Sequence, residues 1–162
     1  MTAAVKSASI RLIPFLAIVV GGGLLIGATN LPGSWYADLA KPSFTPPNWL
    51  FAPAWTVLYI LIAIAGWRTF QRQPGGLAMG FWYAQLALNF AWSLVMFTLH
   101  AIALALIIIT AMLSTILAFV VVQWPRDRIA AYLFMPYAAW VSYAAALNFA
   151  VWQLNSGKYP TF

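Results

Sequence analysis

The chain has 162 residues, enough for one domain, and 64% of them are hydrophobic while only 6% are charged. A soluble domain usually carries about 25% charged residues, so this composition excludes an ordinary soluble fold and indicates an integral membrane protein. The formal charge is +6 and there is no cysteine; the cations stand singly between apolar runs, so we expect them to set membrane topology and expect no nucleic-acid binding, disulfide or thiolate chemistry.

Five apolar stretches are each long enough, at about 20 residues, to cross a bilayer as a helix. The first follows Lys6 and Arg11 as a signal peptide would, but its apolar run is long for a signal and no small-x-small cleavage site follows cleanly. The sequence therefore predicts an all-α fold, a single domain over residues 1–162 that forms an integral membrane bundle of five transmembrane helices. These cover residues 12–29, 49–67, 77–99, 101–122 and 129–154.

The linker over residues 30–48 is much longer than the others. It contains four prolines, so it is not one regular helix. It also carries Trp35, Tyr36 and Phe44, which a merely solvated loop would avoid. A long loop of this kind is usually functional or packed as a lid.

The distribution of the cations predicts the orientation in the membrane. Six of the eight fall on one side of a five-helix bundle and two on the other. Because cytoplasmic loops carry an excess of Lys and Arg, we expect the N-terminus in the cytoplasm of a bacterial cell, and the aromatic loop and the C-terminus across the membrane. The larger group is Lys6, Arg11, Arg68, Arg72, Arg126 and Arg128, and the smaller is Lys41 and Lys158.

Several kinds of chemistry lack the residues they need. The only acids, Asp38 and Asp127, lie in linkers, so ion-coupled transport, proton relays and paired-carboxylate catalysis are not supported. The single histidine, His100, does not make a typical metal site. It either ligates a haem iron from one side or, as we expect, is a surface residue at a turn. We predict no metal and no obligatory cofactor. The run Gly21 to Gly23 indicates close helix packing rather than a phosphate loop.

The third apolar stretch has two roughly opposite stripes at helical spacing. One contains Gln85 and Asn89, whose amides would be costly against lipid, so it should face the bundle interior together with Trp92. The other lets a second backbone approach closely, either from a neighbouring helix of the same chain or, as we favour, from a second protomer in a homodimer. Its residues are Gly80, Ala84, Ala87 and Ala91.

The second and fifth stretches repeat the interior pattern. Pro53 and Pro136 should each free a backbone carbonyl and loosen its helix. Together the three helices predict an apolar, aromatic-lined pocket with a few orienting polar groups, as in many ligand sites; the alternative is that the aromatics simply fill a tight bundle. The residues on these faces are Trp55 and Tyr59 in the second stretch, and Tyr137, Trp140, Ala144, Leu147 and Asn148 in the fifth.

A series of motifs runs through nearly the whole chain. In order they are Trp35-Tyr36 with Lys41-Pro42-Ser43, Thr45-Pro46-Pro47-Asn48-Trp49, Pro53-Ala54-Trp55-Thr56 with Leu58-Tyr59, Gln85-Leu86-Ala87-Leu88-Asn89 with Trp92, Pro136-Tyr137 with Trp140, and Leu147-Asn148-Phe149 with Trp152. Each motif alone is weak evidence for a family. With all of them in this order, the sequence resembles the translocator protein (TspO/MBR) family of tryptophan-rich sensory proteins, also called peripheral-type benzodiazepine receptors.

The resemblance implies a five-helix bundle, usually a dimer, that binds porphyrins, haem and sterols in a pocket under the first long loop. It implies that Trp55 and Trp140 correspond to two tryptophans tied, in bacterial relatives, to porphyrin photodegradation. It also implies that Trp35, Phe51 and Ala52 join the pocket. With the residues singled out above, the predicted ligand-binding set is Trp35, Trp49, Phe51, Ala52, Trp55, Tyr59, Gln85, Asn89, Trp92, Trp140, Ala144, Leu147 and Asn148.

The chain departs from the animal family members at its end. The cholesterol motif there needs a Tyr and then a Lys or Arg after Leu-Asn, where this sequence has Phe149 and Gln153. We therefore expect a receptor or sensor that binds porphyrins or haem and serves tetrapyrrole regulation or transport. The alternative is a light- and oxygen-dependent enzyme that degrades porphyrin with Trp55 and Trp140 as catalytic residues. A third hypothesis is passive or partner-driven transport of the ligand.

Overall fold

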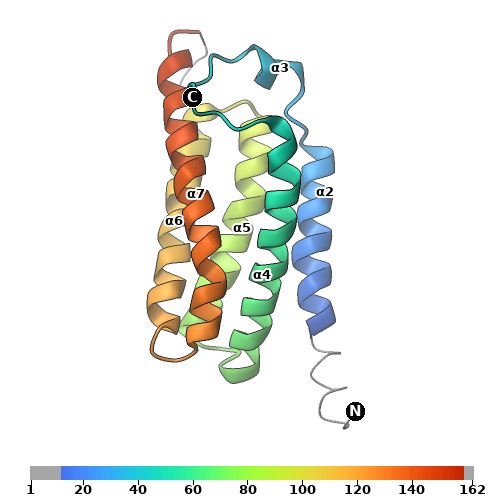
Figure 1. Ribbon diagram of the computed structural model, residues 1–162, viewed down its shortest axis with the longest axis vertical. Helices are drawn as coiled ribbons and strands as arrows, with labels where there is room; N and C mark the ends of the chain where they lie inside the picture. Colours follow the sequence, from blue (N-terminus) through green and yellow to red (C-terminus); the bar gives the residue numbers. More distant parts are fainter. Residues whose placement is uncertain (1–11, 159–162) are drawn as a thin grey trace.

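The computed structural model describes residues 12–158, and within that range the regular secondary structure is entirely helical. Five long helices run side by side (Figure 1). This confirms the all-α membrane bundle predicted from the sequence. The first helix, Leu12–Thr29, contains a π-helical segment η1 (Ala17–Gly21) followed by α2 (Gly22–Thr29); the others are α4 (Phe51–Arg72), α5 (Leu77–Phe97), α6 (Ile102–Gln123) and α7 (Arg128–Asn155).

Four helices among the described residues are long and apolar enough to cross a membrane. They are Leu12–Thr29, Asn48–Arg72, Ile102–Gln123 and Arg128–Asn155. The fifth, α5, has 21 residues, which at 1.5 Å per residue is also the length of a span. Its Trp, Tyr, Gln and Asn side chains keep its hydropathy lower, and it runs alongside the other four (Figure 1).

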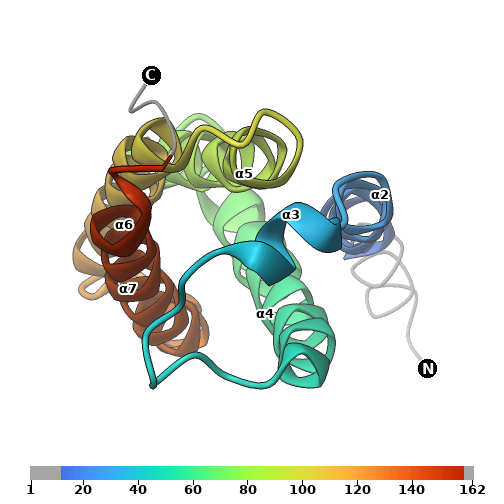
Figure 2. The same cartoon turned by 90° about the horizontal axis from the view of Figure 1, so that it is seen from above.

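The order of the helices around the bundle differs from their order in the chain. Helix α5 packs on α6, α6 on α7 and α7 on α4, while η1 and α2 close the ring against α4 and α5 (Figure 2). The first helix is the least enclosed: only Val19 and Gly23 of its 18 residues are buried. It therefore presents most of its surface to lipid.

The predicted loop contains a short helix, α3 (Gly33–Asp38), which crosses one end of the bundle together with the chain that follows it (Figure 2). The sequence did not predict this helix, because proline and glycine surround its start. Gly33 has φ +59°, a conformation that glycine adopts without strain. Tyr36 and Leu39 are buried against α5, α6 and α7. The loop is thus packed as a lid.

Some helix boundaries and proline effects differ from the predictions. Helix α4 runs to Arg72, five residues beyond the predicted end. Arg68 and Arg72 in this extension both contact Asp127, which holds the extra turn. Pro53 does not loosen α4. It is the third residue of that helix, and the first turn needs no N–H there. Helix α7 continues through Pro136.

The two ends of the bundle differ in charge. Arg68 and Arg72 lie at the end where α6 joins α7, and both contact Asp127, at 3.0 Å and 2.9 Å. Lys41 lies at the other end, in the lid. Lys6 and Arg11 lie outside the described residues, and the orientation in the membrane stays a prediction.

The small-residue stripe of α5 lies on the outside of the bundle. Gly80 and Ala87 are exposed, and Ala84 and Ala91 are partly exposed. A Cβ added at Gly80 would have nothing within 4 Å. The stripe is therefore open to a second chain, and the homodimer stays a prediction.

Candidate ligand-binding cavity

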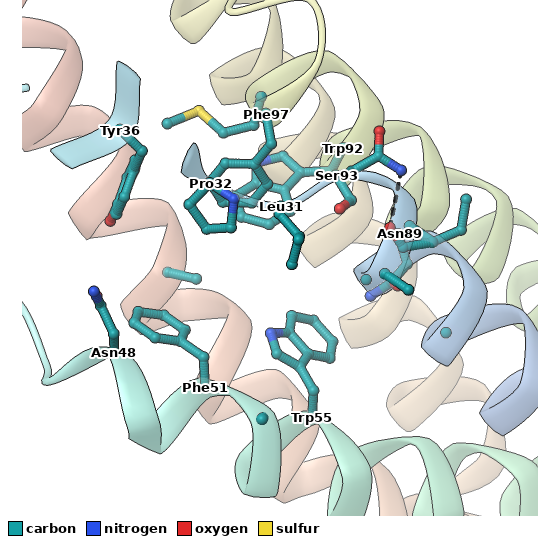
Figure 3. A pocket seen from close by; sticks show the side chains of 18 of the residues that line it. Leu31, Pro32, Tyr36, Asn48, Phe51, Trp55, Asn89, Trp92, Ser93 and Phe97 are labelled. Atoms are coloured by element: carbon teal, nitrogen blue, oxygen red, sulfur yellow. Dashed lines mark hydrogen bonds between the residues drawn. The ribbon is translucent and has the colours of Figure 1, made fainter. Parts of the chain in front are cut away.

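A cavity of about 740 Å³ lies beneath the lid, within the range of roughly 300–1,000 Å³ typical of small-molecule sites. The first helix, the lid, α4, α5 and α7 supply its walls. Figure 3 shows Phe51 and Trp55 pointing from α4 into this space, with Trp92 and Phe97 on the α5 side.

Ten of the thirteen predicted binding residues line this cavity. On α4 they recur every fourth residue from Phe51 through Trp55 to Tyr59, which places them on one face. On α7, Trp140 and Ala144 show the same spacing. The ten are Phe51, Ala52, Trp55, Tyr59, Asn89, Trp92, Trp140, Ala144, Leu147 and Asn148.

The other three predicted residues lie away from the cavity. Trp35 stacks on His100, with ring centroids 4.0 Å apart, because α3 turns the neighbouring Tyr36 toward the cavity instead. Trp49 precedes α4 and is 71% exposed. Gln85 is fully buried, one helical turn before Asn89. His100 is exposed and does not line the cavity either, in agreement with its expected place at a turn.

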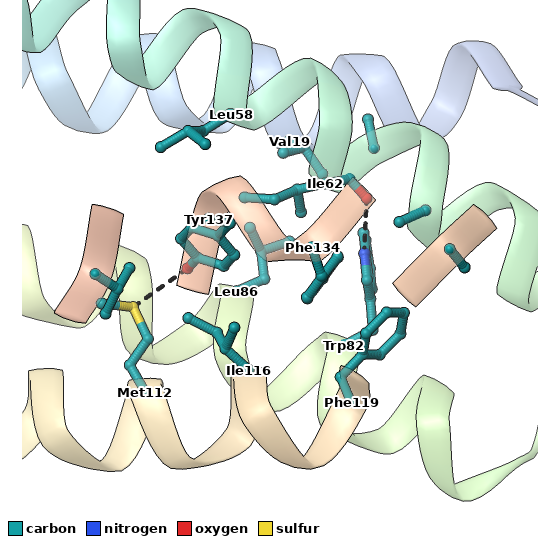
Figure 4. Packing of buried hydrophobic residues seen from close by; sticks show 14 of the residues in the cluster. Val19, Leu58, Ile62, Trp82, Leu86, Met112, Ile116, Phe119, Phe134 and Tyr137 are labelled. Carbon is teal, nitrogen blue, oxygen red and sulfur yellow. Dashed lines mark hydrogen bonds between the residues drawn. The ribbon is translucent and has the colours of Figure 1, made fainter. Parts of the chain in front are cut away.

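A chain of hydrogen bonds fixes the polar side chains at the cavity floor. The Tyr59 hydroxyl donates to Asn89 Oδ1 at 3.1 Å, and Asn89 Nδ2 donates to the Tyr137 hydroxyl at 3.1 Å. The Tyr137 hydroxyl in turn donates to Met112 Sδ at 3.3 Å (Figure 4). Because buried polar groups are costly without partners, this chain lets an amide sit inside an apolar bundle and holds the Tyr59 ring in one orientation.

A second amide is held in the same way higher in the wall. Trp92 Nε1 donates to Asn148 Oδ1 at 3.1 Å, and Asn148 Nδ2 donates to the Ile102 carbonyl at 3.2 Å. These bonds tie α5, α6 and α7 together. Each amide uses one N–H and one oxygen lone pair in these bonds, which fixes its orientation. The rest of the lining is largely apolar and aromatic.

The two tryptophans singled out from the sequence share this surface. The ring of Trp55 lies 5.3 Å from that of Tyr59 and 6.2 Å from that of Tyr137. Phe51, one helical turn before Trp55, meets the Trp140 ring edge-on at 6.0 Å. A flat aromatic ligand in the cavity would therefore find large ring faces supplied by both α4 and α7.

The core beneath the cavity is packed around Trp82 (Figure 4). Its side chain is 1% exposed, and its Nε1 donates to the Ile62 carbonyl at 2.9 Å. A Cβ at Gly66 would overlap the Trp82 indole, so glycine is needed there. Phe119 and Phe134 stack at 4.0 Å nearby. This core gives the cavity a rigid floor, and no local pattern in the sequence indicated it.

Sequence reasoning also missed the contribution of the first helix. Gly23, Leu24 and Gly27 line the cavity. A Cβ at Gly23 would overlap the Tyr59 ring, and one at Gly22 would lie 2.8 Å from the Phe90 ring. The predicted close packing of this glycine run is therefore correct at Gly22 and Gly23, while Gly21 faces open space. Gly23 and Gly27 are four residues apart and so lie on one face of the helix. This spacing is the only feature of the sequence that indicates that the first helix contributes to the cavity.

The lid is attached to the helix ends by hydrogen bonds. The Tyr143 hydroxyl donates to the Phe44 carbonyl at 2.5 Å. The Thr98 hydroxyl and the Asn30 side chain form a further bond where the first helix meets the end of α5. Together with the buried Tyr36 and Leu39, these contacts hold the lid over the cavity.

Comparison with known proteins identifies one family. The family model described as the TspO/MBR family matches residues 13–153. Protein CrtK of Rhodobacter capsulatus is 40% identical over 138 residues, which cover 83% of this chain and 86% of that protein. A tryptophan-rich sensory protein of Cereibacter sphaeroides is 38% identical, covering 83% and 85%, and the human translocator protein is 31% identical, covering 83% and 85%.

Proposed function

This chain belongs to the TspO/MBR family, and from that premise we propose that it binds porphyrins, haem and related tetrapyrroles in the cavity beneath its lid. It is an integral membrane protein, and relatives named tryptophan-rich sensory protein and translocator protein support a sensor or receptor role. In this proposal the bound tetrapyrrole is a ligand rather than an obligatory cofactor. Binding serves tetrapyrrole regulation or transport, and sterols are secondary candidate ligands.

One observation carries the proposal: Trp55 and Trp140 line a single cavity although 85 positions separate them in the chain. A flat macrocycle gains about 0.5–1.5 kcal/mol from each favourable aromatic contact beyond the burial of its area. Most of the lining residues are apolar or aromatic, and the amides of Asn89 and Asn148 are held in fixed orientations. A mostly apolar wall suits the body of a porphyrin. Among the lining residues there is no carboxylate, so ion-coupled transport through this cavity is not supported.

A dark titration of the purified protein with protoporphyrin tests the proposal. Quenching of tryptophan fluorescence reports binding, and Ala144→Phe should weaken it at least tenfold because the added ring occupies the cavity. The matched control is Ala146→Phe, the same change two residues along α7 at an exposed position outside the lining. Equal affinities for the two variants and the native protein would contradict a site in this cavity.

A second candidate function is light- and oxygen-dependent degradation of the bound porphyrin, with Trp55 and Trp140 as the catalytic residues. The specific support is that Tyr59 and Tyr137, two further oxidisable rings, lie within 5.3 Å and 6.2 Å of the Trp55 ring. An oxidised indole at this position would have electron donors beside it.

Illumination in air separates the two candidates. If the protein is an enzyme, the native chain should convert porphyrin to a product with bilin-like absorption, and Trp55→Phe and Trp140→Phe should abolish this turnover. Their dark affinity should fall by about tenfold at most, since each keeps an aromatic ring and 1.4 kcal/mol is one decade. If porphyrin with the native protein yields no more product than free porphyrin in detergent, the enzyme hypothesis is wrong and the receptor hypothesis remains.

A further inference from the structure

Lys41 is the only charged residue among those that line the cavity. The other lining side chains are apolar or carry neutral amides and hydroxyls. Both acids lie elsewhere: Asp38 is exposed outside the lining, and Asp127 contacts Arg68 and Arg72 at the opposite end of the bundle. The ligand space therefore contains a single fixed charge, which is positive and lies at the level of the lid.

The ammonium group of Lys41 is held in place without being neutralised. Its Nζ donates to the Ala37 carbonyl at 2.8 Å and to the Leu39 carbonyl at 3.1 Å, which lie at the C-terminal end of α3. It also lies 4.9 Å from the centre of the Tyr36 ring. An ammonium has three N–H groups. Two are used by these carbonyls, so one is left for a further acceptor.

We propose that Lys41 binds a carboxylate of the ligand, so that the cavity selects planar amphipathic acids over their neutral esters. This inference rests on the proposed function, and it names the ligand class within it. A carboxylate accepts a charge-assisted hydrogen bond, which is roughly twice as strong as a neutral one. The apolar walls strengthen the attraction, because charges interact more strongly where water is excluded.

The position of Lys41 also defines how such a ligand lies. The apolar macrocycle contacts the aromatic walls formed by Phe51 and Trp55, and its acid group points up toward the lid, near the edge of the membrane. A neutral ester keeps the macrocycle contacts but loses the charge-assisted bond. The difference in affinity between acid and ester therefore measures the contribution of Lys41.

The experiment is a dark titration of protoporphyrin IX and of its dimethyl ester against the native protein and three variants. Lys41→Met removes the charge, and Lys41→Arg keeps it. Lys158→Met is the matched control, because it removes a lysine that lies beyond the end of α7 and outside the cavity lining. Lys41→Met should weaken binding of the diacid about tenfold and leave binding of the ester unchanged. Lys41→Arg and Lys158→Met should both retain affinity for the diacid.

Two results would overturn the inference while leaving the proposed function intact. One is an equal loss of acid and ester affinity in Lys41→Met, which would make Lys41 a support of the lid rather than a ligand contact. The other is an unchanged affinity for the diacid. If neither porphyrin binds the native protein, the proposed function itself is wrong and this inference fails with it.

Discussion

Asn155, near the end of α7, forms a two-way hydrogen-bonded pair with the backbone of Ala40 in the lid. Its Nδ2 donates to the Ala40 carbonyl at 2.9 Å, and its Oδ1 accepts from the Ala40 N–H at 3.0 Å. The side chain is 1% exposed. This pair joins positions 115 apart in the sequence and holds the lid against the bundle next to Lys41.

Asn155→Ala should therefore loosen the lid. Each lost hydrogen bond is worth about 1 kcal/mol net, so we expect bound porphyrin to dissociate roughly tenfold faster or more. Stopped-flow fluorescence measures the dissociation rate, and hydrogen exchange should increase around residues 39–41. Gln153→Ala, which removes an exposed amide from the same helix, is the control and should leave both readouts unchanged. Unaltered dissociation in Asn155→Ala would mean that the lid does not limit release.

Gly23→Ala should disturb the cavity wall, because the added Cβ overlaps the Tyr59 ring. That ring does not move freely, since its hydroxyl is bonded to Asn89. We expect a lower melting temperature in detergent and at least tenfold weaker porphyrin binding. Gly21→Ala is the control: its Cβ meets nothing within 4 Å, and alanine favours helix by up to about 1 kcal/mol, so that variant should be at least as stable as the native protein. Equal melting of the two variants would contradict the contact at Gly23.

Asp127 connects three helices at the arginine-rich end and has a pH-dependent effect on stability. Burial raises the pKa of its carboxyl group, but the Arg68 and Ala130 hydrogen bonds and the charges of Arg68 and Arg72 outweigh this and hold the pKa below its usual 3.8. A carboxyl group with a lowered folded-state pKa stabilises the fold above its unfolded pKa. That stabilisation is lost as the pH falls through the lowered value.

Asp127→Asn should consequently melt at a lower temperature than the native protein near neutral pH. Asparagine can still accept the Ala130 N–H as a helix cap, so the cost of about 1–3 kcal/mol comes from the lost charge-assisted hydrogen bonds to Arg68 and Arg72. The difference should shrink as the pH is lowered below 3.8, because the native carboxyl group then becomes neutral as well. Asp38→Asn, at an exposed position, should melt like the native protein throughout. A melting difference that does not change with pH would show that the charge is not what stabilises this end.

The predicted homodimer can be tested on the open stripe of α5. Gly80→Leu combined with Ala84→Leu should reduce the cross-linked dimer in detergent, because bulky side chains keep two backbones apart. The surroundings of Gly80 are empty within 4 Å, so the single chain should still fold. Ala111→Leu, on an exposed face of α6, serves as the control. A dimer fraction that the double variant does not change would assign the interface to another face.

The sequence predicted the helices and the inward faces of the bundle because both follow from local spacing. Hydropathy located the spans, and the cost of amides in lipid placed Asn89 inside. Spacing did not show that Gln85, one turn earlier on the same stripe, lies below the cavity rather than in its wall. That depends on how deep the core around Trp82 extends, which is a property of packing between helices.

The lid was harder to predict for a similar reason. Its aromatic content indicated that it packs, but α3 forms from only six residues with weak local preference. Its orientation depends on long-range bonds such as that between Ala40 and Asn155. Which of Trp35 and Tyr36 turns toward the cavity depends on that orientation. The family resemblance implied Trp35, whereas Tyr36 lines the cavity.

An experimental structure of the protein with protoporphyrin bound in the dark would show where the ligand lies. We expect density for the macrocycle inside the bundle, beneath the lid and in contact with both Trp55 and Trp140. Density for the macrocycle on the lipid-facing outside of the helices, with the cavity empty, would contradict this expectation.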